Sequence, residues 1–233
     1  MTLYYKFKSI IRLPVPIFLK LIFKKYFGKN KLDKQIEEFL NFKNGFYIDL
    51  GAHDGVTQSN TLYYEKYKNW KGVLIEPTFH IFKKCQKFRS NKNSFFNYAC
   101  VSFNFKDEFI KLTYSGLKTF SDYLRPEKQK QHLSKPELNR GETNFTFLAP
   151  TRTLNSILVE VNAPFDIDFL SLDTEGAEFE VLNGIDFKKY KFKFMLIESD
   201  YFPELEKFLS FNNYKFVKKY NYNDYLFKYD FID

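Results

Sequence analysis

The architecture expected of this chain follows from the stretch Gly45-Phe46-Tyr47-Ile48-Asp49-Leu50-Gly51-Ala52-His53-Asp54-Gly55. It predicts an apolar strand that ends near Asp49 and continues into a turn with glycines at positions 51 and 55. Gly51 lets the chain leave the strand sharply, and Gly55 lets the backbone approach a ligand closely. A helix is predicted to follow from about Ser59, and the N-terminus of a helix favours anions. The stretch therefore predicts a ligand site at the end of a strand in a parallel sheet.

His53 narrows the kind of ligand. A dinucleotide fingerprint, G-x-G-x-x-G, needs glycine at that position, so an NAD-linked oxidoreductase is the least favoured interpretation. Acid-x-Gly-x-x-x-Gly is instead the pattern of sites for S-adenosylmethionine (SAM), which hold a nucleoside and an amino-acid tail but no pyrophosphate. His53 is also a candidate general base, since its unperturbed pKa is about 6.5. The alternative is a turn residue that forms only local hydrogen bonds.

A second acid, Glu76, ends the next predicted strand. The short apolar run 72–76 is stopped by Pro77, as expected of a strand that is buried on both faces. An acid in this place accepts hydrogen bonds from the two hydroxyls of a ribose. The alternative is a strand-end carboxylate that faces solvent, but the order strand, turn, helix, strand, acid favours the ribose role.

A third group of acids lies in Asp173-Thr174-Glu175-Gly176-Ala177-Glu178. The helix dipole favours acids in a first helical turn, but it does not explain an acid that also ends the strand. Such a cluster can bind a hard cation, accept a proton, or hold the amino group of SAM. Mutual repulsion is expected to raise the pKa of at least one of them. Asp173, Glu175 and Asp200 could share a divalent cation, and the sequence leaves metal dependence open.

Strands and helices alternate along most of the chain, which predicts a mostly parallel sheet with helices on both faces. An antiparallel hairpin is expected at the C-terminus, around Asn221-Tyr222-Asn223-Asp224. The fold class predicted is α/β, and a terminal hairpin in such a sheet is typical of a SAM-type Rossmann-like fold. The predicted strands are 46–50, 72–76, 95–101, 145–148, 168–173, 194–198, 215–220 and 225–229. The predicted helices are 59–67, 79–89, 153–158, 176–182 and 203–211. A further helix is predicted to be capped by Asp33, with Ile36, Phe39, Leu40 and Phe42 on one face.

The domain organisation expected is a basic amphipathic segment, residues 1–32, followed by one catalytic domain, residues 33–233. Within that domain the region 103–150 breaks the alternation of strands and helices. We interpret it as an inserted loop or lid that contacts the molecule to which SAM donates its methyl group. Its lysine-rich part, 125–140, has no apolar period. A surface excursion without function is the alternative.

The composition restricts the partners. The net charge is +8 and the aromatic content 21%, which permits phosphates, anionic glycans or membrane surfaces without identifying one. Lysine is strongly preferred over arginine, whereas a nucleic-acid surface favours arginine for bidentate contacts, so no specific nucleic acid is expected. The two cysteines form no disulfide framework and indicate a reduced, cytoplasmic location.

Residues 1–27 mix basic and apolar positions. No apolar run approaches the ~20 residues that span a bilayer, and no small-residue cleavage site follows, so a signal peptide is not expected. Residues 17–27 could form a basic amphipathic helix that lies on the inner face of a membrane. The alternative is a helix that packs on the domain and exposes its lysines to water.

Three blocks of sequence, taken in order, resemble the FkbM-type SAM-dependent methyltransferases. They are 46–61, 70–77 and 168–178 with Val181-Leu182-Asn183-Gly184, and the resemblance covers roughly residues 44–200. It implies a class I methyltransferase fold and transfer of a methyl group from SAM to an oxygen. By the same resemblance the cofactor is lined by Asp49, Gly51, Asp54 and Gly55, with Ser59 and Asn60 opening the helix, while Glu76 holds the ribose and Asp173 faces the reaction centre with Glu175.

The function expected is therefore SAM-dependent O-methylation of a hydroxyl, in a sugar of a surface glycan or of a lipid-linked saccharide. Two alternatives stay open: a methyltransferase for RNA or protein, and a non-catalytic fold that binds SAM or a nucleoside. The identity of the acceptor and the oligomeric state do not follow from the sequence.

Overall fold

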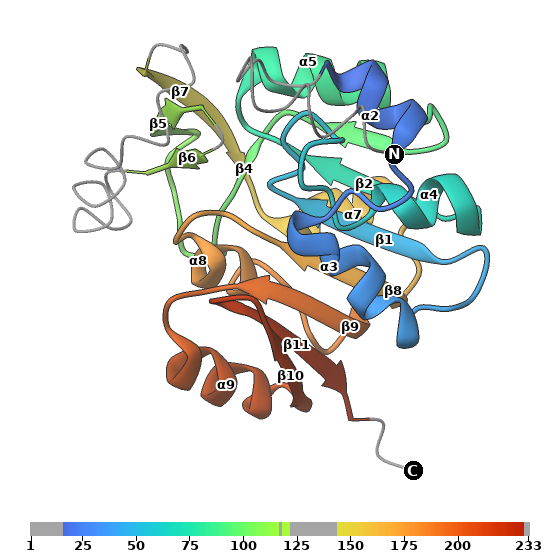
Figure 1. Ribbon diagram of the computed structural model, residues 1–233. Helices are drawn as coiled ribbons and strands as arrows, with labels where there is room; N and C mark the ends of the chain where they lie inside the picture. Colours follow the sequence, from blue (N-terminus) through green and yellow to red (C-terminus); the bar gives the residue numbers. More distant parts are fainter. Residues whose placement is uncertain (1–15, 117, 122–143, 231–233) are drawn as a thin grey trace.

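The computed structural model describes residues 16–116, 118–121 and 144–230. Residues 1–15 and the lysine-rich stretch 125–140 lie outside these ranges, so the predictions made for them stay predictions. The described elements are arranged around one large sheet, with a smaller sheet beside it (Figure 1).

The large sheet has seven strands in the order β10-β11-β9-β8-β1-β2-β3. β1 (Phe46–Leu50) pairs in parallel with β2 (Lys71–Ile75) and with β8 (Asp166–Leu172). β2 also pairs in parallel with β3 (Ser94–Phe96), and β8 pairs in parallel with β9 (Lys191–Glu198). β11 (Asp224–Tyr229) is antiparallel to both β9 and β10 (Tyr214–Tyr220), which confirms the predicted C-terminal hairpin.

Alternate residues of each central strand serve opposite faces of the sheet. In β1, Ile48 and Leu50 belong to one apolar cluster and Tyr47 to the other; in β8, Leu170 and Phe169 divide in the same way. Successive residues of a strand, which lie about 3.3 Å apart along it, point their side chains to opposite faces of the sheet. A strand therefore needs a continuous run of apolar residues when both faces are covered. This requirement explains why the strands could be recognised in the sequence.

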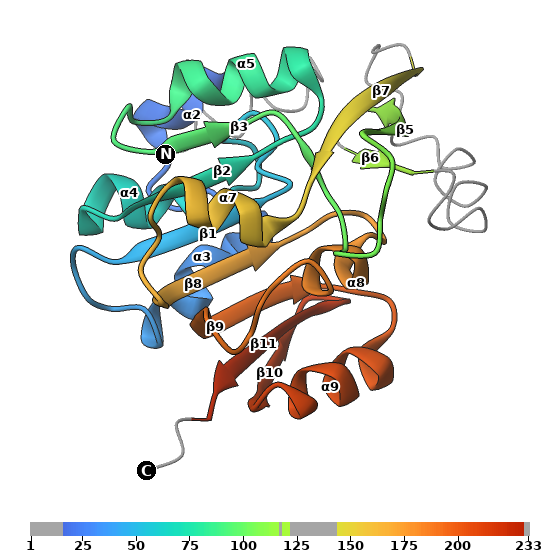
Figure 2. The same cartoon turned by 180° about the vertical axis from the view of Figure 1, so that it is seen from behind.

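Helices cover both faces, as predicted. On one face lie α7 (Leu154–Glu160), α8 (Glu178–Leu182) and α9 (Phe202–Phe211), which are nearest the viewer in Figure 2. On the other lie α3 (Leu32–Gln35), α4 (Leu62–Lys68) and α5 (Phe79–Phe88). Thr153 caps α7 as predicted, because its hydroxyl accepts a hydrogen bond from Ser156 N at 3.1 Å.

Two local predictions were wrong. Asp33 is not a helix cap, because α3 already begins at Leu32; its buried carboxylate instead accepts a hydrogen bond from Phe27 N at 2.6 Å. The expected strand 95–101 is two strands, β3 and β4 (Ala99–Cys100), which belong to different sheets. Asn97 separates them, and its side-chain amide donates to the carbonyl oxygens of Glu76 and Pro77, both at 2.8 Å.

The smaller sheet occupies the described part of the region 103–150. It has the order β4-β7-β5-β6, with β5 (Phe109–Ser115), β6 (Lys118–Phe120) and β7 (Phe145–Arg152) forming antiparallel pairs. β7 ends in parallel register with β4 and leads directly into α7. The described part of the insertion is therefore a small sheet that lies beside the large one (Figure 1).

Candidate functional site

A cavity of about 500 Å³ lies where β1, β2, β8 and β9 end. In an open parallel sheet this edge is where ligands bind, close to the switch in strand order, which here falls between β1 and β8. Residues from both sheets line the cavity, among them Asp49, Gly51, His53, Ser59, Asn60, Glu76, Tyr98, Leu112, Lys118, Phe120, Asp173, Glu175 and Glu198.

Gly51 is required by a close approach of two strand ends. Its φ is +76°, and a Cβ there would lie 1.9 Å from the carbonyl oxygen of Asp173. Asp173 N in turn donates to Leu50 O at 3.1 Å. The turn after β1 and the acid after β8 are therefore in direct backbone contact at the switch point, and no side chain fits between them.

Asp54 and Gly55 were predicted to line the cofactor, but the structure places neither in the cavity wall. Gly55 has φ +77°, and its missing Cβ would meet the Arg89 side chain at 2.6 Å. The Asp54 carboxylate accepts hydrogen bonds from Val56 N at 2.9 Å and Thr57 N at 2.6 Å. Both residues therefore stabilise the conformation of the turn and do not face the cavity.

Arg89 lies at the centre of a buried polar network that supports this turn. Its side chain is 0% exposed, and Nε donates to Glu65 Oε2 at 2.7 Å. Nη1 donates to Gly55 O at 3.1 Å, and Nη2 donates to Tyr47 OH at 2.6 Å. A guanidinium carries five donors in a fixed plane, so one side chain connects the end of α5 to α4, β1 and the turn. Sequence reasoning missed this residue.

Asp49 and Ser59 belong to this network and also line the cavity. Asp49 Oδ2 accepts from Thr61 Oγ1 at 2.5 Å and lies 3.7 Å from Arg89 Nη1, while burial raises the pKa of Asp49. Ser59 Oγ accepts from Leu62 N at 3.1 Å. The helix was predicted to begin at about Ser59, but α4 begins at Leu62. Ser59 therefore lies in the loop before the helix.

Glu76 is held in a fixed orientation at the cavity wall. Its Oε2 accepts from His53 N at 3.0 Å, and its Oε1 accepts from Thr78 N at 2.8 Å. The residue is 5% exposed, and burial raises the pKa of its carboxyl. Each carboxylate oxygen has a second lone pair, so these bonds leave room for further donors. The ribose role stays a prediction.

His53 has a left-handed backbone, with φ +48°. Its Nδ1 lies 3.7 Å from Asp54 Oδ1, and neither ring nitrogen has a hydrogen-bond partner among the described residues. Burial alone would lower the pKa of His53, but the carboxylates of Asp54 and Glu76 outweigh it and raise that pKa above its usual value.

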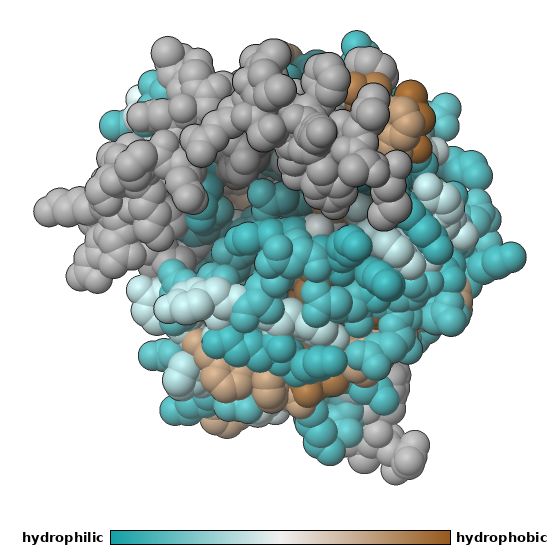
Figure 3. Space-filling view, in the orientation of Figure 1, coloured by the Kyte–Doolittle hydropathy of each residue, from teal (hydrophilic) through white to brown (hydrophobic). Residues whose placement is uncertain are grey.

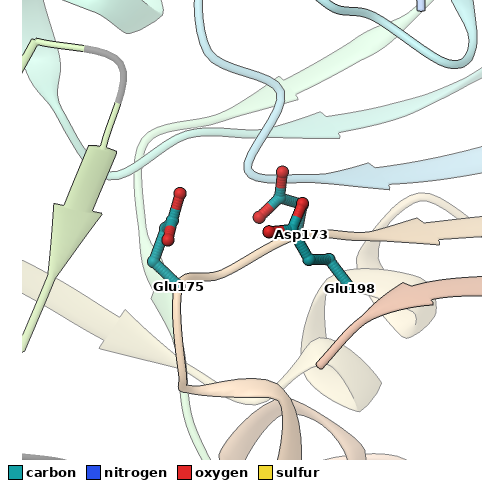
Figure 4. Close-up of side chains that lie close together, drawn as sticks. All are labelled: Asp173, Glu175 and Glu198. Atoms are coloured by element: carbon teal, nitrogen blue, oxygen red, sulfur yellow. The ribbon is translucent and has the colours of Figure 1, made fainter. Parts of the chain in front are cut away.

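Three acids of the cavity wall lie close together (Figure 4). Asp173, Glu175 and Glu198 each offer an oxygen, and these oxygens lie within 4.8 Å of one another. Asp173 Oδ1 is buried and has no partner in the part of the chain that is described. Burial, and then the charges of Glu198 and Glu175, raise the pKa of Asp173 well above its usual value. The neighbouring carboxylates act in the direction expected of mutual repulsion, but burial is the larger cause.

Asp200 is not part of this cluster. β9 ends at Glu198, and the chain then turns toward the hairpin, where Asp200 Oδ1 accepts from Asn223 Nδ2 at 3.1 Å. The group of acids able to share a cation is therefore Asp173, Glu175 and Glu198, not the predicted group with Asp200.

Lys118 brings a positive charge to this cluster from the smaller sheet. Its Nζ lies 2.5 Å from Glu175 Oε2. Burial would lower the pKa of Lys118, but Glu175 outweighs burial and raises it. No motif surrounds Lys118 in the sequence, so nothing in the sequence pointed to it. Its position shows that the smaller sheet forms part of the site.

Strained backbone is concentrated at the cavity. Most of the residues with left-handed φ are asparagine or glycine, which adopt this conformation at little cost. The exceptions are Lys31, His53, Gln58 and Glu175, and the last three of them line the cavity. Longer side chains in a left-handed conformation persist where the surroundings enforce them, typically at functional sites.

Unsatisfied polar atoms point to a polar ligand. Among the described residues, buried atoms without a hydrogen-bond partner include both ring nitrogens of His53, Asn60 Oδ1 and Asp173 Oδ1, and all three residues line the cavity. A buried polar atom without a partner costs free energy unless a ligand or water satisfies it. Asn60 Oδ1 and Asp173 Oδ1 are acceptors, so the wall fits a ligand that brings hydrogen-bond donors and a positive charge.

The strand order, the reversed strand β11 and the acid-lined cavity together define a Rossmann-like fold of the class I methyltransferase type. The family model described as the methyltransferase FkbM domain matches residues 49–223, which is well over half of the chain. The chain therefore belongs to the FkbM methyltransferase family. No curated protein has a sequence that matches it.

Solved structures with similar folds are distant in sequence. The methyltransferase FkbM from Methylobacillus flagellatus KT is 14% identical with a TM-score of 0.48; the match covers 80% of this chain but 44% of that one, so this chain spans less than half its length. TrmK from M. capricolum, solved with S-adenosyl-homocysteine, is 9% identical with a TM-score of 0.40, covering 85% and 71%. A precorrin-6y C5,15-methyltransferase from Geobacter metallireducens GS-15 is 12% identical with a TM-score of 0.41, covering 88% and 90%.

Proposed function

We propose that this protein binds SAM in the cavity and transfers its methyl group to a hydroxyl oxygen. The observation that carries the proposal is a pair of buried acceptors without a hydrogen-bond partner among the described residues, Asn60 Oδ1 and Asp173 Oδ1, in the wall of one cavity. SAM, when bound, supplies a methyl group on a positively charged sulfur. The acids that line the cavity suit such a cation, and the donors of SAM suit the free acceptors.

The roles of the binding residues follow from their places in the wall. Glu76, whose carboxylate is held by two backbone N–H groups, accepts hydrogen bonds from the ribose hydroxyls. The backbone of Gly51 and Ala52, at the end of β1, supports the amino-acid tail. Asn60 Oδ1 adds a free acceptor in the same cavity wall. Arg89 holds the whole turn in place without contacting the ligand.

Asp173 is the best-placed proton acceptor. A general base works best when its pKa lies near the working pH, and burial with two acidic neighbours raises the pKa of Asp173 in that direction. Its Oδ1 has no other partner in the described chain. His53 is the second candidate, but its raised pKa keeps the ring protonated over a wider pH range, so it is less often available as a base.

The acceptor we propose is a sugar hydroxyl in a surface glycan or a lipid-linked saccharide. The smaller sheet supports this, because its residue Phe120, together with Tyr98 just before β4, lines the cavity. Aromatic rings are large, rigid and apolar, and they pack well against the C–H face of a sugar. Lys118 next to Glu175 would in addition attract an acidic substituent on such a sugar.

Calorimetry with SAM and with S-adenosyl-homocysteine, with and without EDTA, tests the cofactor and the need for a divalent cation together. We expect saturable binding of both nucleosides. If neither binds, the proposal is wrong. An EDTA-sensitive heat would assign a cation to Asp173, Glu175 and Glu198, and an unchanged heat would leave Lys118 as the counter-charge of that cluster.

Label transfer from SAM tests the acceptor. Transfer to lipid-linked saccharides or glycan fragments, with a base-stable methyl ether as product, is the expected result. Labelling of RNA or protein instead would replace the sugar acceptor. Binding of SAM without transfer to any of these classes would favour the non-catalytic alternative.

A further inference from the structure

The positive charge of this protein is concentrated at one end of its sequence. The whole chain has 36 Lys and Arg and 28 Asp and Glu. Residues 1–32 contain no acid, so the entire net charge of +8 belongs to them, while basic and acidic residues balance in 33–233. The basic residues of this N-terminal segment are Lys6, Lys8, Arg12, Lys20, Lys24, Lys25, Lys29 and Lys31.

The helix α2 (Ile17–Phe23) lies in this segment and has two different faces. Ile17 and Leu21 pack on a cluster that contains Val56 and Leu62, beside the glycine turn. Ile22 and Phe23 point the other way and are 66% and 74% exposed. In Figure 3 a hydrophobic patch lies over α2, in the place that Figure 1 gives this helix.

The body of the protein holds this exposed pair in place. Lys66 Nζ, on α4, donates to Leu21 O at 2.8 Å, directly before the pair. Lys20 Nζ donates to Thr57 Oγ1, also at 2.8 Å. Lys24 and Lys25 follow the pair and are exposed. The two apolar side chains are therefore presented outward next to two lysines.

We propose that this face of α2, with the exposed Lys24 and Lys25 beside it, binds the surface of an anionic lipid bilayer. Ile22 and Phe23 enter the boundary between headgroups and acyl chains, and the lysines contact lipid phosphates. An amphipathic helix with apolar residues on one side and lysines beside them has this binding mode, and clustered basic residues are attracted to anionic leaflets. The described part of the chain contains no helix long and apolar enough to cross a membrane, so the contact is peripheral.

The chemistry of the patch favours lipid over nucleic acid. Nucleic-acid sites rely on hydrogen-bond donors for phosphates and base edges, and arginine is the usual residue for both. The segment has one arginine among its eight basic residues. An exposed isoleucine next to a phenylalanine gains nothing on a phosphate backbone but gains burial in a bilayer. The proposal concerns location and stands independently of the methyl-transfer reaction.

Co-sedimentation of the full chain with lipid vesicles tests this. We expect binding to vesicles of phosphatidylcholine and phosphatidylglycerol at 3:1, and at least tenfold weaker binding to pure phosphatidylcholine or in high salt. The double variant Ile22→Glu/Phe23→Glu should lose at least tenfold in affinity. Phe211→Glu is the matched control, because Phe211 at the end of α9 is 79% exposed and lies far along the chain from the basic segment.

Equal binding by the parent chain and the double variant would overturn the proposal, and so would tight binding to neutral vesicles. A second variant, Lys24→Gln/Lys25→Gln, keeps the apolar pair and should weaken only the salt-sensitive part of the binding. Tm values of all variants should match the parent, because every substituted side chain is exposed. Binding to RNA at physiological salt with none to anionic vesicles would assign the surface to nucleic acid instead.

Discussion

Two groups of carboxylates in this protein are held in opposite ways. Asp49 and Glu65 surround the buried guanidinium of Arg89, and each accepts further hydrogen bonds from its neighbours. Asp173 and Glu198 lie close to a third acid, Glu175, and the nearest cation in this group, Lys118, pairs with Glu175.

The difference distinguishes acids that are paired within the fold from an acid that we propose takes part in the chemistry. Arg89 lowers the pKa of Glu65 despite its burial, so that carboxylate stays ionised and fixed. The pKa of Asp173 is raised, and one of its oxygens has no partner in the described ranges. A satisfied buried acid costs the protein little, whereas an unsatisfied one is retained only where a ligand completes it.

The largest effect is expected for Asp173→Asn. This change keeps the size of the side chain but removes the proposed proton acceptor, so kcat should fall by about 10²–10⁴. Methyl transfer from labelled SAM measures it, and SAM affinity is measured in parallel. Asp166→Asn is the control, because Asp166 is exposed at the other end of the same strand. A kcat within threefold of the parent would remove Asp173 from the base role.

Removing the cation of the first group, Asp49, Glu65 and Arg89, should lower the stability of the fold. Arg89→Met leaves two buried acids without their cation, so the free energy of unfolding should fall by about 3–5 kcal/mol. Urea denaturation measures this. Arg152→Met is the comparison, because the Arg152–Glu160 pair is partly exposed at 22% and 55%, and such pairs contribute about 1 kcal/mol or less. Equal losses from both variants would contradict the distinction drawn between the two groups.

Glu76→Gln is expected to have an intermediate effect on cofactor affinity. Glutamine keeps one acceptor for the backbone N–H groups of His53 or Thr78, but it loses the charge that strengthens hydrogen bonds to a ribose. SAM affinity should weaken by about 1–2 kcal/mol, which is roughly five- to thirtyfold. Calorimetry gives the value, and an unchanged affinity would exclude Glu76 from the ribose site.

The smallest effect concerns pH. The charge of Lys118 lowers the pKa of Asp173, although burial and the neighbouring acids raise it more. Lys118→Met should therefore raise that pKa further. Because Asp173 must be ionised to accept a proton, the acid limb of the pH–rate profile should move to higher pH, while the rate on the alkaline plateau stays nearly constant. A shift toward lower pH would show that another group controls this limb.

The edge of the large sheet could be predicted from the sequence for a physical reason. A parallel strand buried on both faces is a continuous apolar run, and Asp49, Glu76 and Asp173 each appear near the end of one. Strand ends of a parallel sheet lie at one edge, so these acids had to be neighbours. Their individual roles as ligands did not follow, because partners such as Thr61 and Thr78 depend on how the loops fold.

Lys118 and Arg89 could not be located in this way, because tertiary contacts alone give them their importance. Lys118 comes from an inserted sheet with irregular patterning. For Arg89 a signal existed in the composition. The chain prefers lysine almost throughout and has five arginines, and a buried site that needs several donors in one plane cannot be served by lysine. In such a chain, an arginine at the end of a helix is a candidate for a buried network.

The left-handed residues of the cavity wall have a consequence for selection. His53, Gln58 and Glu175 each hold a backbone conformation that asparagine or glycine would adopt with about 1 kcal/mol less strain. A library selected only for thermal tolerance should therefore enrich these small residues at the three positions. The same library selected for turnover should keep the longer side chains. Selection for heat resistance and selection for activity would then favour different residues at the same three positions.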